Sequence, residues 1–241
     1  MILSVALLCF WAISILTVGP PLVLYAAITR NANLLYYTAR SLTRFGVLLV
    51  GVKVELRGLE HLEPGRNYIF MSNHVSNLDP PVLITSIPGR CSVLVKKELF
   101  RVPVLGRGMK LSELVPVDRG DHDAAIESMH VAIGVLRKGL HMLIYPEGTR
   151  SGDGRLLPFK KGPFHLAMDS GVPVVPVTML GTYEMWPRTR FALQRGTATV
   201  VFHAPLNPRE FTDRDALANA VHDVIASALP PERRNPADAG A

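Results

Sequence analysis

The N-terminal stretch constrains this chain more than any other feature, because Met1–Thr29 contains no charged side chain. A membrane-spanning helix needs about 20 apolar residues to cross a hydrocarbon core roughly 30 Å thick, so the stretch is long enough to span. It has neither the basic start nor the small-residue cleavage site of a signal peptide. We therefore expect residues 1–50 to form a helical segment that anchors the chain to a membrane.

Two geometries remain open for this segment. Pro20 and Pro21 interrupt the helix, since proline removes a backbone donor and clashes with the preceding turn. One geometry is a single kinked span, with Arg30, Arg40 and Arg44 on the cytoplasmic side by the positive-inside rule. The other is a pair of short helices lying in one leaflet, the second of which carries these arginines. The plainer alternative is a helix packed on the core of the domain.

Charge and cysteine content indicate the surroundings in which the chain works. The 26 Lys and Arg exceed the 20 Asp and Glu by 6, which suits an anionic surface or an anionic substrate. The two cysteines, Cys9 and Cys91, form no disulfide framework. We therefore expect attachment to the inner, cytoplasmic membrane, with the catalytic domain facing the reducing cytoplasm.

After residue 51 short apolar runs of strand length alternate with helical patterns. This alternation predicts a single α/β domain over residues 51–229, with a largely buried mixed sheet flanked by helices. A helix is expected over residues 123–138, and Thr212 with Asp215 predicts the capping box of a last helix. Residues 230–241, rich in Pro, Ala and charge, are expected to be a disordered tail. Strands are predicted at residues 52–59, 67–72, 92–97, 114–117, 141–145, 172–180 and 197–203.

The stretch SNHVSNLDPP, residues 72–81, places a histidine and a carboxylate five positions apart directly after a strand. His74 and Asp79 can meet only if the chain turns between them, because residues i and i+5 share neither a helix face nor a strand face. The polar residues between them favour such a turn. A carboxylate at this place would hold the imidazole in one tautomer and make it a better base. The plainer alternative makes Asp79 a helix N-cap and His74 a polar loop residue.

Cationic residues follow several other predicted strands, where open α/β sheets place their ligand crevice. In YPEGTRS, residues 145–151, the rigid fork of an arginine matches a phosphate and a glycine lets the backbone approach a ligand. In LPFKKGP, residues 157–163, two lysines stand where a helix is expected to begin, which also favours an anion. A loop salt bridge and a solvated basic face are the plainer interpretations. The candidate binding residues in these stretches are Glu147, Gly148, Thr149, Arg150, Lys160 and Lys161, together with Lys97 and Arg101 in KKELFRVPVLG, residues 96–106.

Four blocks occur in the order found in the glycerolipid acyltransferases: NHVSNLD, KKELFRVPVLG, YPEGTRS and VPVVPV. The chain resembles this family over roughly residues 67–177, and within it the 1-acylglycerol-3-phosphate (lysophosphatidate) acyltransferases. FKKG and VDRG, residues 159–162 and 117–120, add to the agreement. A histidine and an aspartate at this spacing are a weak signal alone, whereas four ordered blocks at strand ends are a specific one.

The resemblance implies a mechanism and a set of roles. His74 would take the proton from the free hydroxyl of a lysophospholipid, and Asp79 would orient the imidazole without accepting the proton. The hydroxyl would then attack an acyl thioester on coenzyme A or acyl carrier protein, with no metal, no cofactor and no acyl-enzyme. Absence of a G-x-S-x-G nucleophile elbow agrees with direct attack. Implied substrate contacts are Glu147, Gly148, Thr149 and Arg150 to the glycerol phosphate, Lys97 and Arg101 to phosphate or oxyanion, and Arg119, Lys160 and Lys161 to phosphate or carrier.

Rival functions are weaker on the sequence. The chain has no H-E-x-x-H, no cysteine pair and no phosphate-loop pattern of the kind that would indicate a zinc enzyme or a nucleotide-binding protein. A catalytically silent, membrane-bound lipid-binding protein on the same fold is disfavoured by the presence of both His74 and Asp79. Within the family, the acceptor could instead be a lyso-ornithine lipid or lysophosphatidylglycerol, or the enzyme could be a transacylase. YPEGTRS followed by GDGRLLPFKKG favours lysophosphatidate, and the sequence leaves the acyl donor and the chain length open.

Overall fold

Seven strands form one mixed sheet in the order β1-β7-β6-β2-β5-β3-β4, in a computed structural model that describes residues 1–118 and 122–235. β6, β2, β5, β3 and β4 are parallel to one another, whereas β7 is antiparallel to β6 and parallel to β1. The carboxyl ends of five strands therefore lie at one edge of the sheet. All seven predicted strands are confirmed within three residues at each end. The strands are β1 (Val52–Arg57), β2 (Ile69–Ser72), β3 (Cys91–Lys96), β4 (Val115–Val117), β5 (His141–Ile144), β6 (Val174–Leu180) and β7 (Gly196–Phe202).

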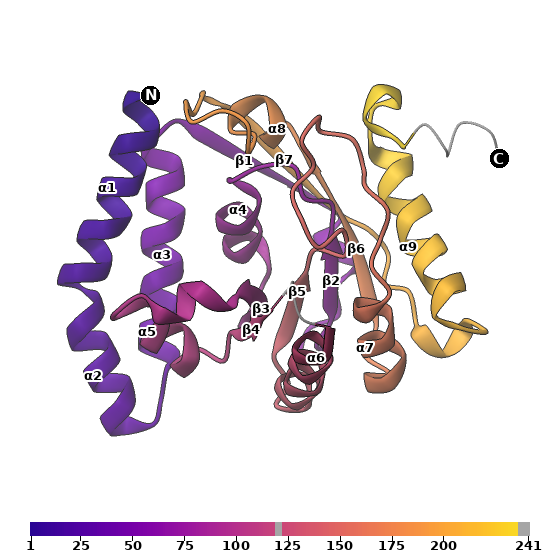
Figure 1. Cartoon of the computed structure of the whole chain (residues 1–241), viewed down its shortest axis with the longest axis horizontal. Coiled ribbons are helices and arrows are strands. Elements are labelled where there is room, and N and C mark those ends of the chain that lie inside the picture. The colour runs from indigo at the N-terminus through magenta and orange to yellow at the C-terminus, as the bar shows by residue number, and fades with distance from the viewer. Residues whose placement is uncertain (119–121, 236–241) are drawn as a thin grey trace.

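Helices cover both faces of this sheet (Figure 1). On one face lie α3 (Asn33–Leu49) and α4 (Asp79–Ser86), and on the other lie α6 (His122–Arg137), α7 (Gly162–Ser170) and α9 (Arg214–Ala228). β2 is buried on both sides, because Phe70 packs into the first cluster while Ile69 and Met71 pack into the second. The α/β prediction with a buried mixed sheet is confirmed. The remaining elements are α5 (Leu105–Leu111), α8 (Thr182–Met185), η1 (Leu59–His61), η2 (Lys97–Arg101), η3 (Pro208–Glu210) and η4 (Pro231–Arg233).

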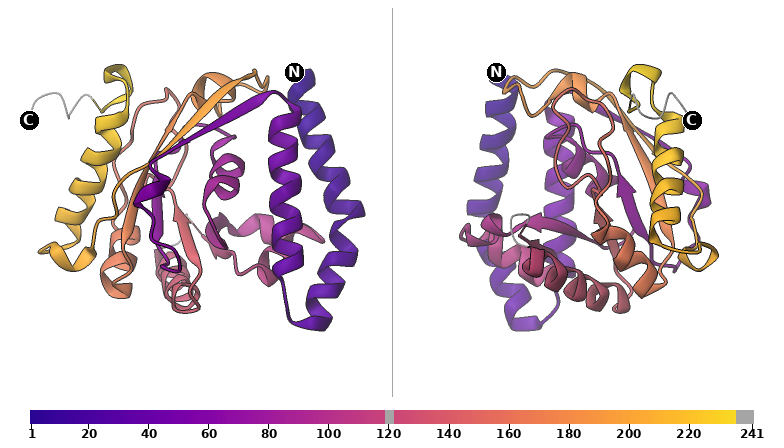
Figure 2. Two further views of the ribbon diagram at one scale, coloured as in Figure 1. Left: turned by 180° about the vertical axis from the view of Figure 1, so that it is seen from behind. Right: turned by 45° about the vertical axis from the view of Figure 1, so that its right-hand side comes forward.

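The N-terminal residues form a bent pair of helices, α1 (Ile2–Thr17) and α2 (Gly19–Thr29), that runs beside α3 (Figure 2). In the described part of the chain no single helix has the length and apolarity to cross a membrane, but this pair, bent by 45°, has both when taken together. One side of the pair packs on the domain, since Leu7 is fully buried and the Ser4 hydroxyl donates to the Phe191 carbonyl. The domain-facing side of the helix pair therefore packs on the core, as the plainer alternative predicted.

The third helix is fixed to the domain by polar contacts. The Arg40 guanidinium donates to the carbonyls of Thr85, Ile87 and Gly89 at the end of α4, and the Tyr36 hydroxyl accepts from the Cys91 amide at 2.9 Å. Arg40 is thus committed to a helix end, where a cation is favourable. α3 belongs to the sheet's helical layer, although residues 1–50 were expected to form one separate segment.

Two further expectations differ from the structure. The last helix is capped by Asp213, whose carboxylate accepts from the amides of Asp215 and Ala216, and not by Thr212. Aspartate is the stronger N-cap, because its charge also favours the helix dipole. The tail expected to be disordered is structured up to residue 235. There Arg233 donates to the Asp153 carbonyl and to Glu184, whereas residues 236–241 lie outside the described part.

Candidate active site

The turn from β2 into α4 brings the predicted histidine and aspartate together. His74 Nδ1 lies 2.8 Å from Asp79 Oδ2, and Asp79 opens α4 with Pro80 behind it. Because a carboxylate oxygen only accepts, Nδ1 carries the imidazole proton and Nε2 is the nitrogen with a free lone pair. Both side chains are buried, with residue exposures of 7% for His74 and 0% for Asp79. This is the arrangement expected of a general base and its orienting carboxylate.

Four donors hold the carboxylate of Asp79. Besides His74, the amides of Val75 and Ser76 donate to Oδ2 at 2.7 Å each, and the Thr182 hydroxyl donates to Oδ1 at 2.7 Å. Asp79 therefore caps the turn that carries His74 as well as binding its ring. The N-cap interpretation of Asp79 and the catalytic one are compatible, since the same oxygen serves both.

An aromatic ring supports the imidazole from the neighbouring strand end. Tyr145, directly after β5, stacks on His74 with ring centroids 4.0 Å apart and an interplanar angle of 20°. Burial raises the pKa of the Tyr145 hydroxyl well above 10, and the charge of Asp79 adds to this effect. The ring is therefore a neutral wall that restricts how the imidazole can tilt.

Glu147 points inward and binds backbone. Its Oε1 accepts from the His74 amide at 2.6 Å and its Oε2 accepts from the Leu157 amide at 3.2 Å, and the residue is only 2% exposed. Burial raises the pKa of Glu147 to about 8, against the lowering effect of the two amide bonds. In this structure the side chain, predicted to hold glycerol phosphate, supports the loop that carries His74.

Arg150 lies beside the same loop. Its guanidinium donates to the Asn77 side-chain oxygen, so one side chain between His74 and Asp79 fixes the predicted phosphate ligand. The amide of Ser151 donates to the His74 carbonyl at 2.8 Å, which ties the two loops together. Gly148 has a φ of +72°, a conformation that other residues rarely adopt. The glycine in this block is therefore required by the turn.

The remaining predicted substrate contacts are Thr149, Lys160 and Lys161 after β5, and Lys97 and Arg101 after β3. Lys160 lies against Gly148, since a Cβ added at this glycine would lie 3.3 Å from the Lys160 Cγ. Thr149 is exposed on the same turn. Lys161 forms an exposed ion pair with Asp215 at 3.4 Å, on the side of α9. As contacts to substrate, these three residues stay predictions.

Lys97 and Arg101 follow β3, two strands away from β2 and so about 10 Å from it across the sheet. The Lys97 ammonium binds the Asp118 carboxylate, which raises the pKa of that lysine. Arg101 is exposed at the end of η2. Arg119 lies outside the described residues. No interaction in the described part of the chain places Lys97 or Arg101 against His74.

Sequence reasoning missed three supporting residues. Thr182 and Tyr145 contact the pair from the segments that follow β6 and β5. The side chain of Asn73 accepts from the Met179 amide at 2.8 Å and donates to the Met179 carbonyl at 3.1 Å. Asn73 stands directly before His74, and that position was a usable signal. For Thr182 the sequence offered none. No group of three or more potential metal ligands occurs among the described residues.

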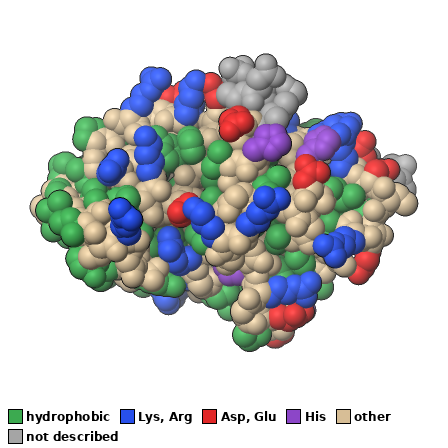
Figure 3. Space-filling view, turned by 90° about the horizontal axis from the view of Figure 1, so that it is seen from below, with side chains coloured by type: hydrophobic (Ala, Val, Ile, Leu, Met, Phe, Trp, Pro, Cys, Tyr) green, Lys and Arg blue, Asp and Glu red, His purple; other side chains and the backbone are tan. Residues whose placement is uncertain are grey.

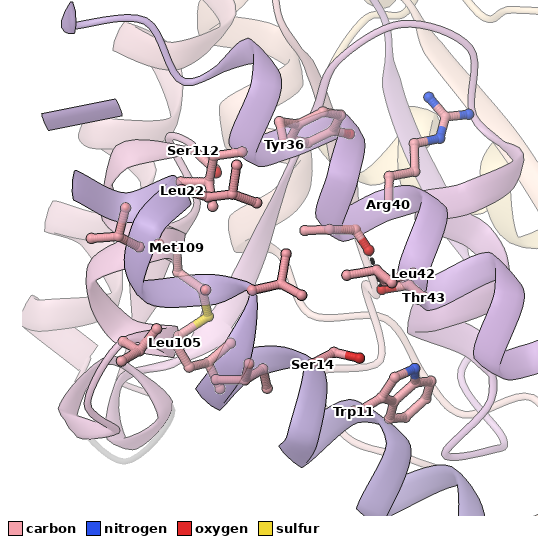
Figure 4. A pocket seen from close by; sticks show the side chains of 18 of the residues that line it. Trp11, Ser14, Leu22, Tyr36, Arg40, Leu42, Thr43, Leu105, Met109 and Ser112 are labelled. Carbon is pink, nitrogen blue, oxygen red and sulfur yellow. Dashed lines mark hydrogen bonds between the residues drawn. The ribbon is translucent and has the colours of Figure 1, made fainter. Parts of the chain in front are cut away.

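A separate apolar cavity of about 410 Å³ lies between α1, α2 and α3 on one side and α5 on the other. Figure 4 shows its side chains converging from these helices, including Trp11, Leu22 and Met109. Pro81 and Ile84 of α4, the helix that begins at Asp79, complete the wall. The cavity therefore borders α4, the helix that begins at Asp79.

Comparisons with known proteins agree with this geometry. The sequence model of the family described as Acyltransferase matches residues 53–180. The chain is 37% identical over 191 residues to a 1-acyl-sn-glycerol-3-phosphate acyltransferase of Limnanthes alba, covering 78% of this chain and 67% of that protein. It is 35% identical over 176 residues to the human alpha enzyme of the same name, covering 72% and 62%.

A solved structure covers more of the chain. The crystal structure of the 1-acyl-sn-glycerophosphate (LPA) acyltransferase PlsC from Thermotoga maritima superposes with a TM-score of 0.78 at 26% identity, over 93% of this chain and 92% of that one. The similarity thus extends over most of the chain. The chain belongs to the acyltransferase family.

Proposed function

We propose that the protein transfers a fatty acyl group from an acyl thioester to the free hydroxyl of 1-acylglycerol-3-phosphate, forming phosphatidic acid. The observation that carries this proposal is the buried His74–Asp79 pair with Arg150 held beside it by Asn77. A base for the hydroxyl and a guanidinium for the phosphate are the two groups that a lysophosphatidate acceptor requires. The names of the relatives at 35% and 37% identity support the same substrate.

The chemistry follows from the orientation of the imidazole. His74 Nε2 takes the proton of the acceptor hydroxyl as its oxygen attacks the thioester carbonyl, and Asp79 stabilises the imidazolium that forms. The carbon–sulfur bond then breaks, and the proton on Nε2 returns to the leaving thiolate. One ester forms and one thiol is released, so the histidine is regenerated without an acyl-enzyme. Coenzyme A and acyl carrier protein both supply such a thioester, and either donor fits the proposal.

The apolar cavity supports a substrate with a hydrocarbon chain. Its lining is almost wholly apolar, and it borders α4 close to the catalytic turn. Alkyl chains leave water for such a space with a gain of about 0.8 kcal/mol for each buried methylene group. A lipid substrate therefore gains binding energy in this protein that a water-soluble alcohol does not.

Attachment to a lipid surface is part of the proposal. The outer sides of α1 and α2 expose large apolar residues, among them Ile13, Leu16 and Ile28, which are 61%, 68% and 73% exposed. In the space-filling view apolar side chains gather at the end of the molecule formed by these helices (Figure 3). Exposed apolar patches of this extent mark interaction surfaces. Because α1 packs on α3 and α2 packs on both α3 and α5, we favour a position along one leaflet over a span.

The test is thiol release from acyl-coenzyme A by detergent-purified protein, with and without lysophosphatidate. Release should require the acceptor, and His74→Ala should lower the rate by on the order of 10²–10⁴-fold. The donor is tested by replacing acyl-coenzyme A with acyl carrier protein, and the acceptor by replacing lysophosphatidate with lysophosphatidylglycerol. Full activity of the histidine variant would refute the mechanism, and release with another lysolipid alone would refute the acceptor.

A further inference from the structure

Thr182 joins the catalytic pair from a distant part of the chain. Its hydroxyl donates to Asp79 Oδ1 at 2.7 Å across 103 positions of sequence, and both residues are 0% exposed. The other three donors to Asp79 all bind Oδ2. Among the hydrogen bonds of the described residues, Thr182 is thus the one donor to Oδ1.

The turn after β6 fixes the position of this threonine. Gly181 has a φ of +80°, and a Cβ at that position would lie 2.3 Å from the Thr197 carbonyl oxygen, so the backbone requires glycine. Thr182 then begins α8, where its own carbonyl accepts from the Trp186 amide at 3.0 Å. The side chain is held by a tight turn and a short helix, and its single proton is committed to the carboxylate.

We propose that Thr182 is a positioning residue for the general base. Its hydroxyl fixes the Asp79 carboxylate so that Oδ2 stays aligned with His74 Nδ1, and it draws part of the negative charge onto Oδ1. The inference rests on the proposed function, in which His74 is the base. The residue lies beyond the segment that the family model matches, which ends at residue 180.

Removing the hydroxyl has two consequences. Oδ1 becomes a buried acceptor without a donor, so the carboxylate is less restrained and kcat falls on the order of ten-fold. The negative charge also concentrates on Oδ2, next to the imidazole, which stabilises the protonated ring. The acid limb of the pH profile of kcat/KM therefore moves to higher pH. The KM for lysophosphatidate stays unchanged, because a fully buried side chain does not contact the acceptor.

The experiment compares Thr182→Val, which keeps the shape of the side chain, with Thr182→Ser, which keeps the hydroxyl. Thr197→Val is the matched control, since Thr197 is an exposed threonine on the neighbouring β7. Steady-state rates of thiol release are measured across the pH range for each variant, beside thermal unfolding. Thr182→Val should lower kcat and move the acid limb, Thr182→Ser should restore both, and the control should change neither. If Thr182→Val does not fold, Thr182→Ala replaces it.

A readout that needs no activity separates this inference from the proposed function. The proton on His74 Nδ1 should give a downfield resonance, identified by its loss in His74→Ala, and Thr182→Val should shift it. If the wild type does not acylate lysophosphatidate, the proposed function fails, but this shift still tests the positioning role. An unchanged resonance in Thr182→Val would overturn the inference. So would an unchanged pH profile with only a lower unfolding temperature, because that result indicates packing alone.

Discussion

Replacing Glu147 by glutamine should remove a specific pH dependence from the stability of the fold. The residue is buried, has no cationic partner among the described residues, and binds the amides of His74 and Leu157. Burial raises its pKa from 4.5 to about 8. Between these two values the folded protein keeps a proton that the unfolded chain has released. The stabilising contribution is therefore complete below pH 4.5 and is lost as the pH rises through 8.

The magnitude follows from proton linkage. Stability should fall by roughly 1.4 kcal/mol for each pH unit inside the window, and by up to about 5 kcal/mol across all of it. In a protein of this size 1 kcal/mol shifts the unfolding temperature by about 2–4 °C, so each pH unit should lower it by roughly 3–6 °C. Glutamine does not titrate, and Glu147→Gln should lose this slope. The NH₂ group of the glutamine side chain is a donor and cannot accept from the Leu157 amide. The loss of this hydrogen bond should lower the stability of the fold by about 1 kcal/mol at every pH.

The assay is thermal unfolding in detergent from pH 5.5 to 8, for the wild type, Glu147→Gln and Glu60→Gln. Glu60 is exposed in η1 and serves as the matched control. Burial lowers the pKa of His141 and His203, which gives an opposite slope below pH 6.5. The difference between wild type and variant cancels both histidines. Equal slopes in wild type and Glu147→Gln would refute the reasoning and show that the two amides hold an ionised carboxylate.

Three further outcomes are expected. Asn77→Ala should free the Arg150 guanidinium and raise the KM for lysophosphatidate about ten-fold with little change in kcat, by initial-rate kinetics; an unchanged KM would show that Arg150 needs no such support. Leu7→Ala should destabilise the fold by about 2–5 kcal/mol in denaturant unfolding, because the side chain is fully buried; a loss below about 1 kcal/mol would show that α1 is not part of the core. Ile13→Asp combined with Leu16→Asp, on the exposed side of α1, should reduce flotation with liposomes at an unchanged unfolding temperature; full flotation would remove these helices from the lipid-binding surface.

Much of the fold was readable because its signals are local. Apolar runs of four to seven residues, such as those now seen as β2 and β6, are too short for most helices and indicate buried strands without knowledge of their neighbours. The sequence did not place every helix end correctly, because adjacent residues compete for the capping position, as Thr212 and Asp213 do. The short α5 and α8 were not predicted, since helices of seven and four residues carry too little periodicity.

By itself the sequence determined the family, the order of the strands along the chain and the pairing of His74 with Asp79. Four short blocks in order indicated the family, and short apolar runs indicated the strands. The turn-forming residues between the histidine and the aspartate already limited how these two could meet. The apolar character of the N-terminal residues was also evident from the sequence. The sequence did not show whether they pack on the core or on a lipid surface, because one apolar helix face suits either contact.

Only the tertiary structure decided what surrounds the pair. In the folded chain Glu147 points inward and accepts from the His74 amide, and Lys97 binds Asp118. Thr182 donates to Asp79 across 103 positions of sequence. Such contacts depend on strand order and register, which seat β6 and β5 on either side of β2. No periodicity along the chain records that order, because it is set by how the buried faces of all the elements pack together.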